Sequence, residues 1–264
     1  MQESATPVDS RPVNKHRIEA LSKGLEILGL FNETRMSLRM KEISELTGIP
    51  LPTVFRLLAT LQIDGYIERR VDRSYQPGVA VLTLGSAAVR SSGLVQSGEK
   101  PLRELAERTG ETVNLGVLLE DRVLYVVRIR NADLLAANIQ VGSTLPAVHT
   151  SMGKVLLAAL GEDELKKRIK PPSFAEGIGP NAIPDLANLR RQLVEVRAQG
   201  YAIQDEELSV GLRSISAPVV GEGGKVVAAM NIAVSSSRYT SDGLRENLLP
   251  ELLATASMVS ERLQ

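Results

Sequence analysis

The stretch that decides the fold is LRMKEISELTGIPLPTVFRLLATLQIDGYIERRVDRSYQ, residues 38–76. Apolar residues at helical spacing lie on both sides of a turn at Thr47-Gly48. A short strand begins near Gly65-Tyr66, residues 72–74 form a turn, and Tyr75 begins the return strand. The pattern predicts a helix-turn-helix followed by a two-stranded wing. Such a unit presents one helix to a DNA major groove and a basic ribbon to the flanking backbone.

On either side of this stretch the sequence divides into further parts. Apolar residues at spacings of three and four predict an amphipathic first helix over 17–32, which completes a three-helix core. The run 79–89 is apolar and predicts a linker helix that packs against a second subunit. The predicted parts are a disordered polar tail over 1–15, a winged helix-turn-helix domain over 16–78, a linker helix over 79–93 and a C-terminal domain over 94–264.

The C-terminal part mixes helical and strand patterns. A helix is predicted over 102–108, with Pro101 at its start, and β-rich runs follow at 112–119 and 122–129. The other predicted segments are helices at 151–160, 163–169, 185–199 and 243–262, a Pro/Gly-rich loop at 170–184, and a hairpin of strands 212–220 and 225–234. This order predicts an α+β fold, in which helices flank an antiparallel sheet.

Composition excludes several classes of site. The chain of 264 residues has no net charge, no cysteine and only two histidines, so we expect no disulfide, no metal site and no cysteine nucleophile. The N-terminus lacks the apolar segment of a signal peptide, and no run is long and apolar enough to span a membrane. These features predict a cytoplasmic protein without a cofactor. Residues 11–80 carry 11 basic and 8 acidic side chains, so DNA binding would need several copies of the domain.

Four segments, in order, resemble the IclR family of bacterial transcription regulators. They are Thr47-Gly48-Ile49-Pro50 with 53–58, Leu145-Pro146 with Thr150-Ser151-Met152-Gly153-Lys154, Gly200-Tyr201-Ala202 with 205–207, and 211–219. The resemblance covers roughly residues 16–262. It implies a GAF-like effector-binding domain, dimers that pair into tetramers, and ligand-dependent control of promoters. The segments at 145–154 and 212–216 look closest to regulators of aromatic catabolism, of the protocatechuate and hydroxybenzoate type.

Basic and polar side chains of the helix-turn-helix and wing are the candidate contacts to double-stranded DNA. Arg56 lies in the first turns of the second helix, where arginine binds guanine or a phosphate, and Thr53 is placed to touch a phosphate or a thymine methyl group. The full candidate set is Arg39, Lys41, Thr53, Arg56, Arg69, Arg70 and Arg73. The alternative is an exposed helix arginine and a solvated hairpin without a DNA role.

The predicted recognition helix departs from the family pattern. Leu51 and Pro52 stand where the family usually has a polar pair, and Phe55 stands where histidine is frequent. Proline has no N–H to donate to a phosphate, although it suits a first helical turn. Sequence specificity would then rest on apolar contact with thymine methyl groups, on Arg56 and on DNA shape.

The resemblance also implies an effector pocket between the sheet and the helix that begins near Gly153. Carried over by position, the lining is Ser151, Met152, Gln204, Leu212, Ser214, Asn231 and Ile232. A helix N-terminus favours a carboxylate, and the apolar members suit a ring or short carbon chain, so a small organic acid is the expected effector. The alternative for each residue is ordinary packing, and Ser214 would then lie on a solvent face.

Three other features invite a catalytic or ligand-binding interpretation. His149 precedes Ser151, but we expect it to line the pocket or bind a backbone group, since no nucleophile–base–acid set accompanies it. The glycine-rich run 221–225 precedes a strand and lacks the ending of a phosphate loop, so it predicts a hairpin turn. The carboxylates 205–207 are interpreted as structural. No catalytic residue is therefore predicted.

These observations predict a ligand-responsive, DNA-binding regulator of a catabolic operon. Two alternatives remain at this point. One is an enzyme with its active site in the C-terminal domain, and the other is a winged helix that serves only as an assembly module.

Overall fold

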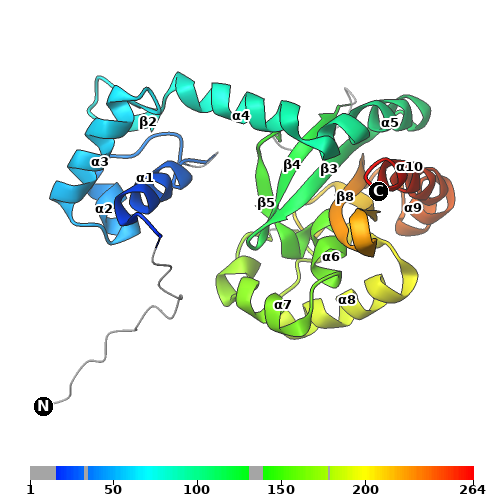
Figure 1. Cartoon of the computed structure of the whole chain (residues 1–264). Coiled ribbons are helices and arrows are strands. Elements are labelled where there is room, and N and C mark those ends of the chain that lie inside the picture. Colours follow the sequence, from blue (N-terminus) through cyan, green and yellow to red (C-terminus); the bar gives the residue numbers. More distant parts are fainter. Residues whose placement is uncertain (1–15, 33–34, 131–138, 178) are drawn as a thin grey trace, which may run out of the picture. The chain divides into compact units, whose positions relative to one another are not determined.

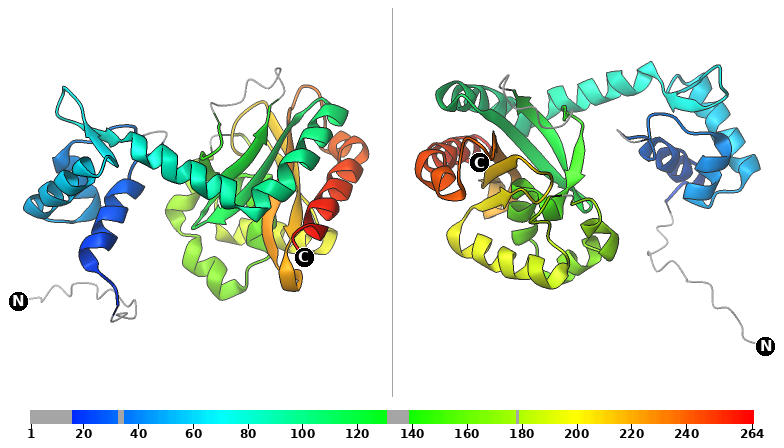
Figure 2. Two further views of the ribbon diagram at one scale, coloured as in Figure 1. Left: turned by 45° about the horizontal axis from the view of Figure 1, so that its top comes forward. Right: turned by 180° about the vertical axis from the view of Figure 1, so that it is seen from behind.

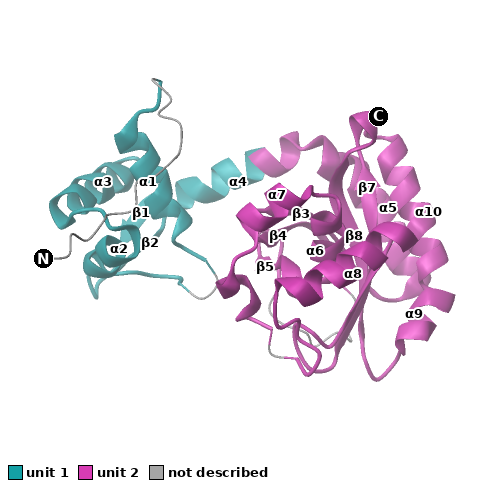
Figure 3. Ribbon diagram, turned by 90° about the horizontal axis from the view of Figure 1, so that it is seen from below, with its two compact units in different colours: residues 1–87 teal, residues 88–264 magenta. Residues whose placement is uncertain are grey.

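The computed structural model of the chain describes residues 16–32, 35–130, 139–177 and 179–264. The predicted tail over 1–15 lies outside the described residues. The chain forms two compact units, residues 1–87 and 88–264, and the boundary falls within helix α4 (Figure 3). Each unit has its own buried apolar core, as expected for a chain of this length.

The first unit is a winged helix-turn-helix. Its elements are α1 (Glu19–Gly29), α2 (Met40–Thr47), α3 (Leu51–Ile63), β1 (Ile67–Arg69), β2 (Tyr75–Pro77) and the start of α4 (Val79–Ser91). Gly48 ends α2 in the left-handed conformation, φ 68°, which glycine adopts without a steric penalty and which turns the chain into α3. Ile27, Ile43 and Leu58 are almost fully buried and hold the three helices together. The observed helix α1 is shorter than the predicted range 17–32. Ile18, just before it, has an extended backbone, and Leu30 follows the last helical residue.

The second unit contains a six-stranded antiparallel sheet (Figure 1). The strand order is β5-β4-β3-β8-β7-β6, with β3 (Thr112–Leu119), β4 (Arg122–Ile129), β5 (Thr144–Pro146), β6 (Ala202–Asp205), β7 (Leu212–Val220) and β8 (Val226–Ser235). Neighbouring strands β7 and β8 are joined by a hairpin, as predicted, with a short 3-10 turn at Glu222–Gly224. The predicted α+β class is thus confirmed, although β5 and β6 were not predicted.

Helices cover both faces of this sheet (Figures 1 and 2). On one face lie α5 (Gly93–Thr109), α9 (Ser241–Asn247) and α10 (Leu249–Glu261). On the other lie α6 (Ser151–Ala158), α7 (Glu162–Arg168) and α8 (Leu186–Gln199), with 3-10 turns η1 (Ala147–His149) and η2 (Pro171–Phe174). The two layers give two separate buried clusters of apolar side chains, one on each side of the strands.

Two helix predictions were wrong in their limits, and each of these helices contains a proline. Pro101 lies inside α5 instead of at its start, because the helix already begins at Gly93, where the Ser92 hydroxyl accepts from Val95 N–H. Pro101 leaves the carbonyl of Ser97 without its helical donor, and Arg262 Nη1 contacts that oxygen at 3.4 Å. The predicted helix 243–262 is two helices, which break at Leu248 before Pro250.

Candidate functional site

The recognition helix α3 turns an apolar side to the core and a mixed side outward. Val54 and Leu58 are buried, whereas Phe55 and Arg56 are exposed. Leu51 begins the helix, and Pro52 follows in the first turn, where a missing N–H is tolerated. Phe55, which like Leu51 and Pro52 departs from the family pattern, is 58% exposed, an unusual position for a phenyl ring. The outward side thus offers an aromatic ring beside a guanidinium.

The predicted cationic residues of this unit differ in how they are held. Arg56 and Arg73 form no side-chain hydrogen bond or ion pair with another described residue. Arg69 lies over the Tyr75 ring at 5.9 Å, and Arg70 donates to Gln76 at 2.9 Å. Arg73 lies in the turn of the wing with φ 65°. Two of the arginines are therefore unpaired, and two are oriented by neighbours.

The other predicted contacts lie before and after the turn. Arg39 is exposed just before α2, and its backbone N–H donates to Glu42 Oε2 at 2.6 Å. Lys41 is exposed and pairs weakly with Glu45 at 3.7 Å. Thr53 is half-buried in the first turn of α3. All seven predicted residues thus belong to one unit, and Thr53 is the least accessible of them.

The second unit holds a small cavity of about 20 Å³ between the sheet, η1 and the loop 206–211. It is lined by Asn114, Tyr125, Arg128, Ile139, Leu145, His149, Thr150, Gln204, Leu208, Leu212, Ser214, Asn231 and Ala233. Four of the seven predicted pocket residues are among them, Gln204, Leu212, Ser214 and Asn231. Ser214 is buried, so the alternative that placed it on a solvent face was wrong.

The three other predicted pocket residues are not in the lining. Ser151 is close, since its Oγ lies 2.7 Å from Ser214 Oγ. Met152 is buried in the apolar cluster under α6. Ile232 belongs to the cluster on the opposite face of the sheet, because it alternates along β8 with Asn231 and Ala233, which face the cavity. The prediction that Ile232 lines the pocket is therefore corrected.

Arg128 is a cavity residue that the sequence pattern did not predict. Its Nη1 donates to Asn114 Oδ1 at 2.8 Å, while its buried Nε has no partner among the described residues. Burial lowers the pKa of this guanidinium, yet arginine stays charged, and no described carboxylate forms an ion pair with it. Among the described residues, the positive charge of Arg128 in the cavity therefore has no carboxylate partner.

A β-bulge explains why alternation along β4 fails to predict Arg128. Leu115 pairs with Val127 and Gly116 with Tyr125, so Val126 is an extra residue in β4. Tyr125 faces the cavity, and without the bulge Arg128 would face the opposite side of the sheet. The extra residue shifts the alternation by one position and turns Arg128 toward the cavity.

His149 is fully buried beside this cavity. Its Nε2 lies 3.2 Å from the carbonyl oxygen of Phe174, which holds the ring against the 3-10 turn η2. Its Nδ1 is buried and has no partner among the described residues. Burial lowers the pKa of His149, and the nearby Lys154 ammonium lowers it further, against the opposing effects of the Phe174 carbonyl and Glu176. Both roles expected from the sequence, pocket lining and a backbone contact, are present in the geometry.

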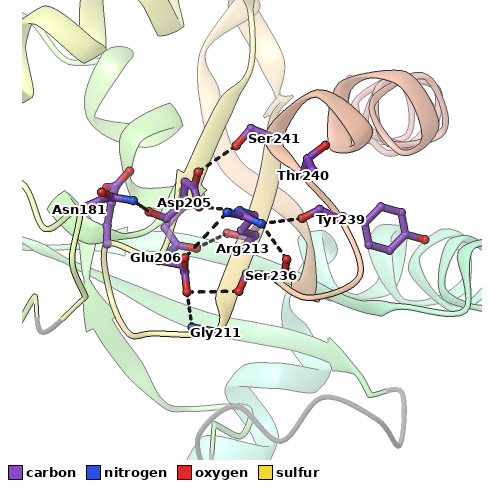
Figure 4. A network of polar contacts seen from close by, with 12 residues as sticks. Asn181, Asp205, Glu206, Gly211, Arg213, Ser236, Tyr239, Thr240 and Ser241 are labelled. Atoms are coloured by element: carbon purple, nitrogen blue, oxygen red, sulfur yellow. Dashed lines mark hydrogen bonds and ion pairs between the residues drawn. The ribbon is translucent and has the colours of Figure 1, made fainter.

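The loop 206–211, which brings Leu208 to the cavity, is fixed at its base by a polar network (Figure 4). Arg213 Nε contacts Asp205 Oδ1 at 2.5 Å, and Arg213 Nη1 donates to the carbonyls of Ser236 and Tyr239 at 2.8 Å. Glu206 Oε1 accepts from the N–H of Gly211 at 2.6 Å.

The Glu207 carboxylate forms a separate ion pair, with Lys154 of α6 at 2.5 Å. The acidic run 205–207 is thus structural, as predicted, and each of its carboxylates has a partner on this chain. Within the described residues, no group of histidine, cysteine or acidic side chains is arranged to hold a metal ion.

No single described helix meets the length and hydropathy of a membrane span. Two bent pairs, α2 with α3 and α4 with α5, meet them only when their halves are combined.

Comparison with known proteins agrees with this geometry over almost the whole chain. The family model described as "Bacterial transcriptional regulator IclR C-terminal" matches residues 86–261, and the "IclR helix-turn-helix domain" matches residues 20–71. The Pca regulon regulatory protein of Pseudomonas putida is 34% identical over 238 residues, which cover 90% of this chain and 81% of that protein. The regulator XynR of Escherichia coli K12 is 33% identical over 222 residues, which cover 84% of this chain and 88% of XynR.

A solved structure supports the same assignment. The crystal structure of an IclR family transcriptional regulator from Brucella abortus matches with a TM-score of 0.82 and 26% identity, over 95% of this chain and 94% of that one. The matching proteins are named as transcriptional regulators, which agrees with the predicted regulator and not with the alternative of an enzyme. This chain belongs to the IclR family of bacterial transcriptional regulators.

Proposed function

We propose that this chain controls a catabolic operon in response to a small carboxylate that binds in the cavity of its second unit. The observation that supports the carboxylate is Arg128, a charged group that faces the cavity without a carboxylate partner among the described residues. Arg128 is half-buried, and an unpaired charge that is partly removed from water carries a free-energy cost that a bound anion would reduce. Guanidinium groups bind carboxylates through two parallel hydrogen bonds, so the chemistry fits.

Other lining groups support the same ligand class. Gln204 is 1% exposed and its Nε2 has no partner among the described residues, so it offers a second donor. Ser214 and Asn231 add polar groups from neighbouring strands β7 and β8. Ile139, Leu145 and Leu208 form the apolar part of the wall, which suits a ring or a short carbon chain.

The size of the cavity indicates how binding would be communicated. A volume of about 20 Å³ holds little more than one water molecule, which needs about 10–15 Å³ on this measure. An organic acid therefore requires the lining to move outward. The part proposed to move is the tip of the loop between Glu207 and Gly211, which brings Leu208 to the cavity. Glu206 and Glu207 are held by ion pairs and would stay in place. A ligand that binds only the opened arrangement shifts the population toward it.

DNA binding is proposed to use α3 and the wing. Arg56 would bind a guanine edge or a phosphate, Phe55 would contact thymine methyl groups, and Arg69, Arg70 and Arg73 would bind the flanking backbone. Arg39, Lys41 and Thr53 complete the proposed contact surface. The excess of basic over acidic side chains in this unit is small, so affinity would come from several copies on one duplex.

Assembly is proposed to use apolar surface on α1 and α4. Leu21 and Leu25 of α1 are 61% and 59% exposed, and Leu82 and Leu84 of α4 are also exposed. A groove of about 440 Å³ in the first unit is lined by α1, α3 and Leu84. Apolar surface of this extent favours association, so we propose a homodimer that pairs into a dimer of dimers, with α4 as the linker. A protein that binds the chromosome in this way would act in the cytoplasm.

Calorimetric titration of the full-length protein with benzoate, 4-hydroxybenzoate, pyruvate and lactate tests the carboxylate site. Saturable binding of at least one acid is expected. The variant Arg128→Gln should weaken that binding roughly tenfold or more, the typical effect of losing a charged hydrogen bond. Arg130→Gln is the matched control, since it removes the same charge from an exposed residue. Equal losses in both variants would show that Arg128 is not the carboxylate anchor.

A further inference from the structure

In the imidazole of His149, Nε2 has a hydrogen-bond partner and Nδ1 has none among the described residues. Nε2 lies 3.2 Å from the Phe174 carbonyl oxygen, and a carbonyl can only accept, so the proton of the neutral ring is on Nε2. Nδ1 then carries a lone pair. The hydrogen bond to η2 therefore fixes the tautomer and leaves Nδ1 as an acceptor beside the cavity.

The ring is also kept neutral and in place. Its environment disfavours protonation, because the site is buried and the ammonium of Lys154 lies nearby. The Phe174 carbonyl and Glu176 act in the opposite direction. Gly177 packs against the imidazole so closely that a Cβ there would lie 2.6 Å from Cε1 and Nε2. A buried acceptor with a fixed orientation is the arrangement that selects for a donor on a ligand.

We propose that His149 selects effectors that carry a hydroxyl group in addition to a carboxylate. The carboxylate would bind Arg128, as in the proposed function on which this inference rests, and the hydroxyl would donate to His149 Nδ1. Both residues line one cavity, which also has apolar lining residues, so after the opening proposed above a single hydroxylated acid would reach both groups. An acid without the hydroxyl would leave Nδ1 buried and unpaired, which lowers its affinity.

Two substitutions separate the nitrogen atoms. His149→Gln places its amide near the position of Nε2, so it keeps a donor for the Phe174 carbonyl and loses the acceptor at Nδ1. His149→Asn does the reverse and keeps a hydrogen-bonding group near Nδ1. Comparing the two distinguishes selection of a ligand from general support of the fold, since both variants change the ring but only one removes the acceptor.

The experiment is calorimetric titration of the full-length wild type and both variants with matched acids: benzoate against 3- and 4-hydroxybenzoate, and propionate against lactate. In at least one set, the wild type should bind the hydroxylated acid roughly tenfold more tightly, the range for one buried hydrogen bond. His149→Gln should reduce that preference to within about twofold, whereas His149→Asn should retain part of the preference.

The outcomes separate this inference from the proposed function. Binding of plain and hydroxylated acids with equal affinity by the wild type would overturn the selection by His149 while leaving the carboxylate site in place. An equal preference in wild type and His149→Gln would also overturn it. A third outcome is that no acid binds while the protein still binds its upstream duplex, meaning the DNA upstream of its own gene. The proposal of a carboxylate effector would then be wrong, and so would the inference about His149.

Discussion

Lys154 and Glu207 form an ion pair of 2.5 Å in which both side chains are almost completely buried, 3% and 7% exposed. Lys154 also donates to Gln192 Oε1 at 3.1 Å, which ties α6 to α8. Burial raises the pKa of the Glu207 carboxyl and lowers the pKa of the Lys154 amine, so each charge depends on the other. The pair joins the helix below the cavity to the loop that covers it.

Removing one member of this pair should destabilise the second unit. Lys154→Met leaves a buried carboxylate without its partner, so the free energy of unfolding should fall by about 3–5 kcal/mol. Denaturant unfolding of the full chain measures this. Lys100→Met is the control, because its pair with Glu104 is exposed and is worth about 0–1 kcal/mol. The double variant Lys154→Met/Glu207→Leu should recover much of the loss, and equal losses in the single and double variants would contradict the account.

Stability should depend on pH through His149. Its pKa in the folded protein lies below the ordinary value of 6.5, so the unfolded chain binds the proton more readily. The contribution of His149 is therefore complete above pH 6.5 and is lost as the pH falls toward the lowered pKa. The melting temperature of the wild type should drop between pH 7 and pH 5. His149→Gln should show a smaller drop over that range, and identical pH profiles would exclude this origin.

Gly177 should be intolerant of a side chain. A Cβ at this position would lie 2.6 Å from His149 Cε1, and the ring is buried and bonded to Phe174, so it has little freedom to move. Gly177→Ala should cost about 1–3 kcal/mol of unfolding free energy, as overpacking of a core does. The control is Gly93→Ala, at the exposed first position of α5, where a Cβ meets nothing within 4 Å and alanine suits the helix, so no loss of stability is expected. Equal stabilities of the two variants would mean that the imidazole can shift.

Arg56→Ala should weaken binding of the full-length protein to its upstream duplex. A guanine contact is worth about 1–3 kcal/mol, so a loss of roughly fivefold to a hundredfold is expected in fluorescence anisotropy. If Arg56 binds a phosphate instead, the salt dependence should fall by about one unit of slope. Arg103→Ala removes an exposed arginine of the second unit and serves as control. An affinity unchanged by Arg56→Ala would remove α3 as the recognition helix.

Phe55→Ala tests the apolar contact separately. The exposed ring makes little contribution to the folded core, so the substitution should leave stability within about 0.5 kcal/mol. Its effect should be confined to sites with thymine at the contacted positions. The measurement compares DNA affinity on duplexes that carry thymine with affinity on duplexes that carry uracil, which lacks the methyl group. If Phe55→Ala lowered the affinity equally on both duplexes, the assignment would be contradicted.

The sequence predicted those features of the fold that depend on local pattern. The turn at Gly48, the wing and the strands 112–119, 122–129 and 212–220 follow from periodicity and turn residues, and the structure confirms them. The short strand β6 was missed, because four residues carry too little alternation to distinguish a strand from a loop. Pro101 was placed at a helix start, because proline is favoured in the first turn of a helix, whereas α5 already begins at Gly93 after the Ser92 cap.

The candidate cavity was predictable in part, and for a clear reason. Four lining residues were predicted by carrying over pocket positions from the family resemblance: Gln204, Leu212, Ser214 and Asn231. Arg128 was missed because one extra residue in β4 reverses the face of every side chain after it. Ile232 was included wrongly, because neighbouring residues of a strand face opposite sides of the sheet. Register and bulges are set by pairing across the sheet, which a single sequence does not display.

The central claim is that an acid in the cavity changes the affinity for DNA. The direct test is an anisotropy titration of the full-length protein on its upstream duplex, at fixed salt, with and without a saturating acid that calorimetry shows to bind. The account predicts a change in DNA affinity of roughly fivefold to 150-fold in the wild type, the usual range of coupling between two sites. In Arg128→Gln the change should be absent at the same acid concentration. An acid that binds the wild type but leaves its DNA affinity unchanged would contradict the account.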